Sequence, residues 1–270
     1  MPLFAYFGVV AAISTRSLPG ALPRAFPTPV TFRAELSDGL GTTVHMAAYD
    51  LAGTDVRVVA LPRAEPLLAF CLRSRVAHAL VGGFFVTSTG EALGELRAAG
   101  IRRTSVPFTA PWGDVRSCIQ VESAMVRIAR RDELPAEPRG DLLQAGPLLV
   151  HQGLAVTFDG EDPEGFSAAS EQFDSDITAG RHPRAALGVA DGVLLAVACD
   201  GRAADDAGLS LGELADLMAS LGALEAINLD GGGSASLVCD GRLMNRPREQ
   251  DGTDIPGGRA VATVLAISPR

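Results

Sequence analysis

The stretch SLGELADLMASLGALEAINLDGGGSASL, residues 210–237, combines a helix, a strand and a glycine loop in immediate succession. Ser210 and Glu213 form a capping box, which predicts that a helix begins there. Apolar residues then recur with helical spacing, and Gly222 suits the left-handed conformation that ends a helix. Residues 223–229 follow as an apolar strand. The stretch predicts a helix beside a sheet, with a polar loop where the strand ends.

The loop after that strand is Asp230-Gly231-Gly232-Gly233-Ser234. Three successive glycines leave the backbone open to close approach, and their N–H groups can form a nest for an anion. Because side chains alternate along a strand, Asn228 and Asp230 are expected on one face. The alternative is a flexible turn with no ligand. No Gly-Lys-Ser/Thr follows, which excludes a P-loop, and no helix is expected after it, which excludes a Rossmann fingerprint.

The remaining pattern contains more strands than helices. Asp191-Gly192 and Asp240-Gly241 mark two hairpins, and residues 42–61 are expected to form another, broken at residues 53–55. Pro66 can open a helix whose apolar positions continue to Leu80. The fold class expected is α+β, with a mixed, mainly antiparallel sheet and a few packed helices. We expect residues 1–41 to form an N-terminal strand and an extended lead-in, and residues 42–270 to form one domain.

Composition narrows the classes of function. The chain has 270 residues and a formal net charge of -9, which argues against general nucleic-acid binding. Its four cysteines form no CxxC pair, so buried free thiols are expected instead of a zinc site. The apolar first residues lack a positive segment and are too short to span a membrane. This favours a cytoplasmic location, with secretion as the alternative.

Polar residues also gather where other strands end. Arg184 precedes one strand, Arg202 follows the next within Asp200-Gly201-Arg202, and Asn245 and Arg246 follow the second hairpin. Arginine binds phosphate through bidentate hydrogen bonds. The alternative for each cluster is a solvated basic turn. His45, His78 and His151 show no metal-ligand spacing, and no GxSxG or HExxH motif occurs.

Taken in order, several segments resemble the phosphodiester glycosidase family. They are ALVGGFF (79–85), QAGPLLVHQG (144–153), RHPRAALGV (181–189), CDGR (199–202), residues 210–237, NRP (245–247) and Arg259. The resemblance implies that Gly82 and Gly83 lie at the site, and it favours a strand over a helix at residues 94–98. One departure is Val81, where the family usually has Asn, because an amide donor and acceptor are then missing from the expected site.

The resemblance implies hydrolysis of a sugar-1-phosphodiester to free sugar and phosphomonoester, with no cofactor required. Arginines among Arg184, Arg202 and Arg246 would hold the phosphate. A carboxylate would act as base or nucleophile at the anomeric carbon, with Asp230 the first candidate and Asp200 the second. The side chains of Asn228 and Asn245 would bind sugar hydroxyls or orient the carboxylates, and residues 231–234 would let substrate approach the backbone.

Two other functions stay open at this point. One is a phosphodiesterase that attacks phosphorus with a divalent cation, calcium or magnesium, held by Asp200 and Asp230. The other is a non-catalytic protein that binds sugar phosphates, which Val81 favours. The expected partner is a small-molecule or glycan sugar phosphodiester, with no nucleic acid and no membrane span.

Overall fold

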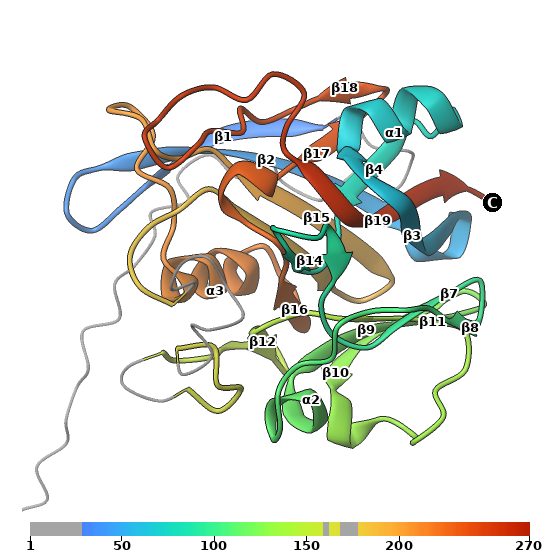
Figure 1. Ribbon diagram of the computed structural model, residues 1–270. Helices are drawn as coiled ribbons and strands as arrows, with labels where there is room; N and C mark the ends of the chain where they lie inside the picture. Colours follow the sequence, from blue (N-terminus) through green and yellow to red (C-terminus); the bar gives the residue numbers. More distant parts are fainter. Residues whose placement is uncertain (1–28, 159–161, 168–177) are drawn as a thin grey trace, which may run out of the picture.

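Antiparallel β-sheets make up most of the protein in the computed structural model, which describes residues 29–158, 162–167 and 178–270 (Figure 1). A seven-stranded sheet and two five-stranded sheets pack around a shared hydrophobic core. Every pair of neighbouring strands in these sheets is antiparallel within the described residues. The prediction of a mainly antiparallel sheet is therefore confirmed. Strands account for much more of the structure than helices do, so the fold is more sheet-dominated than the α+β class suggests.

The first sheet carries the strand that leads to the glycine loop. Helix α3 (Leu211–Ser220) covers one of its faces, where Leu214 packs in the same cluster as Leu195 and Val197. In spatial order its seven strands are β1 (Val30–Glu35), β2 (Gly41–Asp50), β15 (Val193–Cys199), β14 (Arg184–Val189), β16 (Glu225–Asn228), β12 (Leu148–His151) and β13 (Leu154–Ala155).

The second sheet supplies the other side of the main core. Its strands in spatial order are β18 (Arg242–Leu243), β17 (Leu237–Cys239), β4 (His78–Val81), β19 (Ala260–Pro269) and β3 (Thr54–Pro66). Helix α1 (Leu67–Ser74) packs against this sheet.

The third sheet is built from the chain between β4 and β12. Its strands in spatial order are β10 (Met125–Arg130), β9 (Ser117–Glu122), β11 (Asp141–Gln144), β7 (Leu96–Ala98) and β8 (Ile101–Arg102). The same part of the chain contains the short helix α2 (Trp112–Val115) and the pair β5 (Phe85–Val86) and β6 (Glu91–Ala92).

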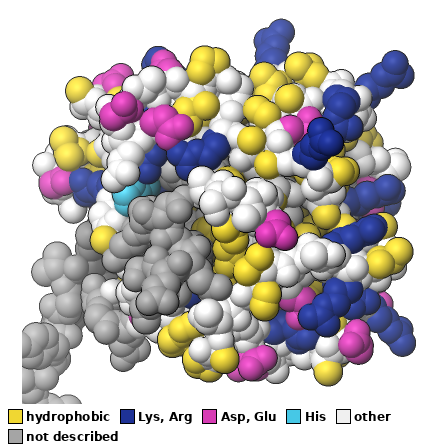
Figure 2. Space-filling model, in the orientation of Figure 1, with side chains coloured by type: hydrophobic (Ala, Val, Ile, Leu, Met, Phe, Trp, Pro, Cys, Tyr) yellow, Lys and Arg dark blue, Asp and Glu magenta, His cyan; other side chains and the backbone are white. Residues whose placement is uncertain are grey.

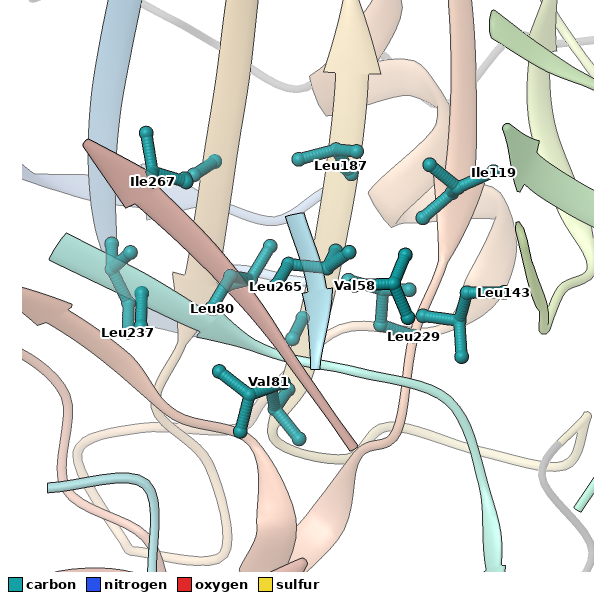
Figure 3. Close-up of a cluster of buried hydrophobic side chains, with 14 of the residues drawn as sticks. Val58, Leu80, Val81, Ile119, Leu143, Leu187, Leu229, Leu237, Leu265 and Ile267 are labelled. Atoms are coloured by element: carbon teal, nitrogen blue, oxygen red, sulfur yellow. The ribbon is translucent and has the colours of Figure 1, made fainter. Parts of the chain in front are cut away.

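One hydrophobic core joins the three sheets. Figure 3 shows Leu187 and Leu229 from the first sheet region beside Leu265 from the second and Ile119 and Leu143 from the third. All five side chains are at most 1% exposed. The strands whose ends carry the polar candidate residues are anchored in this close-packed core. The core therefore fixes the positions of those residues.

The decisive stretch folds as its pattern predicts. Ser210 and Glu213 make both hydrogen bonds of the capping box, and Gly222 has a φ of 86°. The hairpin around Asp191-Gly192 is present as β14 and β15, and the hairpin around Asp240-Gly241 as β17 and β18. Residues 96–98 are the strand β7, as the family resemblance favoured.

Two local predictions are wrong. Residues 42–61 do contain two strands, but they form no hairpin, because β2 pairs with β15 in one sheet and β3 pairs with β19 in another. The helix after Pro66 ends at Ser74, because Arg75 adopts a left-handed conformation, and Leu80 lies in β4 instead. Long-range pairing places β2, β3 and Leu80, and periodicity along the chain does not record such pairing.

The structure can be compared with two further predictions, those for the N-terminal region and for the cysteines. The strand expected in the first residues lies outside the described part of the chain. Residues 30–35 pair along β2 and so belong to the first sheet. Each of the four cysteines is a buried free thiol, as predicted.

Gly82 should tolerate no side chain, whereas Gly212 should. A Cβ at Gly82 would lie 2.4 Å from Thr263 Oγ1 and 2.8 Å from its carbonyl, while a Cβ at Gly212 meets nothing within 4 Å. We expect Gly82→Ala to lower the free energy of unfolding by about 3 kcal/mol, since the backbone of β19 must move. Gly212→Ala, in helix α3, should raise it by about 0.5 kcal/mol. Urea unfolding of both variants tests this, and equal small effects would contradict it.

Candidate active site

The glycine loop is an ordered turn held by neighbouring strands. The N–H of Asp230 donates to the carbonyl of Gly82 at 3.1 Å, and the N–H of Gly232 donates to the carbonyl of Pro183 at 2.8 Å. Residues Gly232–Ser234 form a single 3₁₀ turn. These bonds place the ends of β4, β14 and β16 beside one another, and they argue against the flexible-turn alternative.

Two arginines lie directly against the glycines. A Cβ at Gly232 would be 3.1 Å from Nη2 of Arg202, and a Cβ at Gly233 would be 3.1 Å from Nη2 of Arg259. The glycines therefore let two guanidinium groups approach the loop backbone. Arg202 follows β15 and Arg259 precedes β19, so both sheets contribute to this pair.

The two arginines and Glu249 influence one another electrostatically. Burial and the positive charge of Arg259 lower the pKa of Arg202, while Glu249 opposes that shift. Glu249 accepts a hydrogen bond from Nη2 of Arg259 at 2.5 Å. Arginine stays protonated despite such a shift, so the loop faces two permanent positive charges and one carboxylate.

The local charge contrasts with that of the whole chain. All 23 basic residues are arginines, against 32 acidic residues. Figure 2 shows basic and acidic side chains interspersed over one face, with basic ones gathered toward the side of β3, β7 and β8. A net negative protein can therefore still present an anion-binding group of arginines.

Asp230 is the carboxylate of the loop itself. The residue is partly exposed, but its Oδ2 atom is buried, and Oδ1 accepts a hydrogen bond from the N–H of Gly231 at 3.0 Å. It stands two residues before the glycine that meets Arg202. Partial exposure and nearby cations are what a carboxylate needs to meet an anionic substrate.

Asp200 is placed differently. It is 3% exposed, and Oδ2 lies 3.1 Å from Nε2 of His45, whose Nδ1 is 3.0 Å from the hydroxyl of Thr31. Oδ1 accepts a hydrogen bond from the N–H of Arg246 at 2.6 Å. Both carboxylate oxygens are thus engaged inside the protein, which favours a positioning role.

The segment that Asp200 holds is the arginine loop, defined here as residues 245–259. Besides the bond to Asp200, Nη1 of Arg248 donates to the carbonyl of Gly201 at 3.1 Å. In return, Nη1 of Arg202 donates to the carbonyl of Arg248 at 2.9 Å. The arginine loop is therefore fastened to the turn Asp200-Gly201-Arg202, and it ends at Arg259 beside the glycines.

Several predicted binding residues are buried. Asn245 joins the N–H of Leu237 to the carbonyl of Ala235, at 3.0 and 2.7 Å, and is 3% exposed. Asn228 is 1% exposed and donates to the carbonyl of Gly146 at 2.9 Å; its Oδ1 has no hydrogen-bond partner among the described residues. These hydrogen bonds hold backbone segments around the loop. Sugar binding by the two amides, and orientation of the carboxylates by them, stay predictions.

The other predicted residues divide between the site and its surroundings. Arg184 is 3% exposed and donates from Nε to the carbonyl of Leu209, with its Cδ 3.9 Å from where a Cβ on Gly231 would be. Ser234 is 1% exposed. Arg246 extends to the surface, with a 62% exposed side chain paired with Asp254. Phosphate binding by Arg184 or Arg246 stays a prediction, and their contacts favour Arg202.

Gly82 and Gly83 serve close packing beside the loop. A Cβ on Gly83 would lie 3.0 Å from the carbonyl of Gln144, and the N–H of Gly83 donates to Thr263 Oγ1 at 3.0 Å. Val81, the residue in place of the family's Asn, is 0% exposed and belongs to the main core (Figure 3). The Val81 side chain therefore packs in the core, directly before Gly82, whose carbonyl accepts the hydrogen bond from the N–H of Asp230.

Arg259 and Glu249 are the site residues that the sequence-based candidate set lacked. Arg259 was recognised only as part of the family resemblance. Glu249 lies in a polar segment, RPREQDGTD (246–254), whose composition is typical of a solvent-exposed turn. Its proximity to the glycine loop depends on the bonds that fasten the arginine loop, and no local pattern encodes these.

The described residues lack two kinds of feature. Within them, no group of three or more His, Cys, Asp or Glu side chains is arranged to hold a metal ion. No helix in that part of the chain is long and apolar enough to cross a membrane.

Comparison with known proteins shows to which family the chain is similar. The model of the phosphodiester glycosidase family matches residues 74–268. The mouse enzyme N-acetylglucosamine-1-phosphodiester alpha-N-acetylglucosaminidase is 29% identical over 177 residues, which are 62% of this chain but 32% of the mouse protein. The chain thus spans about a third of the length of this curated relative.

Solved structures show the same fold. The catalytic domain of the zebrafish enzyme of that name, auto-inhibited by its pro-peptide, aligns with a TM-score of 0.69 and 20% identity, covering 97% of this chain and 87% of that chain. A hypothetical protein from Synechocystis aligns with a TM-score of 0.61 and 20% identity, covering 91% of this chain and 62% of that one. With the family match extending over most of its length, the chain belongs to the phosphodiester glycosidase family.

Proposed function

We propose that the protein hydrolyses the glycosidic C–O bond of a sugar-1-phosphodiester, giving free sugar and a phosphomonoester. The observation that carries this proposal is the convergence of Arg202 and Arg259 on the glycine loop that begins at the partly exposed Asp230. Guanidinium groups and backbone N–H groups suit a phosphate, and the carboxylate suits an anomeric carbon.

Charge moves in the direction that this site favours. When the bond between C1 and the phosphate oxygen breaks, its electron pair goes to that oxygen. The singly charged diester then becomes a monoester with a second negative charge. Arg202 and Arg259 would stabilise this developing charge.

Asp230 would complete the reaction at the sugar. As a base it takes a proton from the water that attacks C1; as a nucleophile it bonds to C1 and is released by water in a second step. Asp200 is less suited to either task, because both of its oxygens are engaged in the interior. The same burial weakens the alternative in which Asp200 and Asp230 hold a metal ion for attack on phosphorus. We therefore expect turnover without an added cation.

The proposal is tested by incubating the protein with a panel of sugar-1-phosphodiesters, including α-N-acetylglucosamine-1-phospho-methylmannoside and UDP-sugars, with and without EDTA. The expected result is release of free sugar from at least one member, unchanged by the chelator. Release that EDTA abolishes would favour the metal-dependent alternative. Tight binding without release would favour the non-catalytic one.

A further inference from the structure

Two arginines, Arg202 and Arg259, lie beside the glycine loop. Among the described residues, Glu249 is the one carboxylate that forms an ion pair with either of them. Its side chain is 46% exposed and that of Arg259 is 34% exposed, so the pair lies at the surface of the site. Glu249 also acts on Arg202, whose pKa it raises against the effect of burial. The carboxylate is thus within electrostatic range of both guanidinium groups.

We propose that Glu249 makes this anion site selective for the singly charged phosphodiester over the doubly charged phosphomonoester. The inference rests on the proposed function and adds to it the discrimination between substrate and product. Arg202 and Arg259 supply two positive charges beside the loop, and Arg184 supplies a third, buried beside Gly231. Glu249 and Asp230 supply two negative charges, so a second negative charge on the ligand meets a site whose positive charge is already largely offset.

The consequence concerns release of the product. A phosphomonoester has a second pKa near 6, so it is mostly a dianion above pH 7. Two unopposed arginines would hold that dianion more strongly than the diester. With Glu249 present, the increase in ligand charge on cleavage is met by repulsion, and the monoester leaves. The same repulsion opposes charge development during cleavage, so selectivity is gained at some cost in the rate of the chemical step.

Removing the Glu249 carboxylate should strengthen anion binding by an amount that grows with the charge of the ligand. One charge acting across several ångströms of partly solvated protein changes the binding of a singly charged anion about threefold. The same change acts twice on a dianion, so Glu249→Gln should tighten binding of a dianion about tenfold. The ratio of the two dissociation constants should therefore shift about threefold toward the dianion.

The test uses ³¹P NMR titrations with dimethyl phosphate and methyl phosphate at pH 8, with no turnover involved. Wild type should bind dimethyl phosphate at least as well as methyl phosphate, and Glu249→Gln should shift the ratio of the two dissociation constants about threefold toward methyl phosphate. Glu249→Asp, which keeps the charge, should restore the wild-type ratio. Glu65→Gln, which removes the carboxylate of a separate pair with Arg73, should leave the ratio unchanged.

Each result is decisive for a different claim. An unchanged ratio in Glu249→Gln, with both anions still bound, would overturn the role of Glu249 while leaving the phosphate site intact. Failure of wild type to bind either anion would overturn the inference together with the phosphate site of the proposed function. Thermal unfolding of each variant shows whether a loss of binding reflects a loss of fold.

Discussion

Asp230→Asn should lower kcat by at least about a thousandfold, because the amide can neither accept a proton from water nor form a bond to C1. The fold should survive, since the amide oxygen of Asn can still accept the hydrogen bond that Oδ1 receives from the N–H of Gly231. Steady-state kinetics on the best substrate of the panel and urea unfolding measure the two effects. A variant with more than a tenth of wild-type kcat would remove Asp230 from this role.

Two other aspartates serve as comparisons. Asp191, exposed in the turn between β14 and β15, is the matched control, and Asp191→Asn should change neither activity nor stability measurably. Asp200→Asn should mainly lower stability, whereas Asp230→Asn should mainly lower activity. Because the buried Asp200 carboxylate accepts two hydrogen bonds and loses its charge in the variant, the free energy of unfolding should fall by about 2–3 kcal/mol. A stable, inactive Asp200→Asn would instead make Asp200 the reacting carboxylate.

Arg202→Ala should lower kcat/KM by about a hundred- to a thousandfold, since the developing charge on the leaving phosphate loses a fixed cation. Part of the loss will come from the arginine loop, because Nη1 of Arg202 also donates to the carbonyl of Arg248. Arg202→Lys keeps a charge without the bidentate geometry, so it should recover part of the activity. The measurement is kcat/KM for all variants on one phosphodiester.

Arg246→Ala is the matched control for that result. Arg246 was an equal candidate for phosphate binding from sequence, but its side chain is 62% exposed and pairs with Asp254. We expect its loss to change kcat/KM by less than about threefold, as for other exposed ion pairs. If Arg246→Ala lowers kcat/KM more than Arg202→Ala does, the phosphate binds nearer to Arg246 than to the proposed position beside Arg202 and Arg259.

The parts of the fold that were predictable are those encoded locally. The capping box at Ser210, the stop at Gly222 and the turns at Asp191-Gly192 and Asp240-Gly241 each depend on a few neighbouring residues, and all are present. The pairing of β2 with β15 and of β3 with β19 depends on partners more than 100 residues away. The apolar pattern of residues 42–61 is equally consistent with a hairpin, so only the full structure separates the two.

The candidate site shows the same division. The glycine loop and Asp230 are recognisable because consecutive glycines after a buried strand are unusual in a sheet interior. Which arginines meet them is decided by the ends of β15 and β19, at Arg202 and Arg259, and by the fastening of the arginine loop. Asp200 illustrates the limit: its position at a strand end suits a catalytic carboxylate, whereas its burial against His45 favours a positioning role, and sequence alone does not record that burial.

Hydrolysis in ¹⁸O-labelled water, followed by mass spectrometry of both products, tests the proposed cleavage most directly. Attack at the anomeric carbon puts the label into the sugar and leaves the phosphomonoester unlabelled. We expect that result, because the site opposes a carboxylate to two arginines suited to hold a leaving phosphate. Label in the phosphomonoester would show attack on phosphorus and would contradict the glycosidase mechanism proposed for this protein.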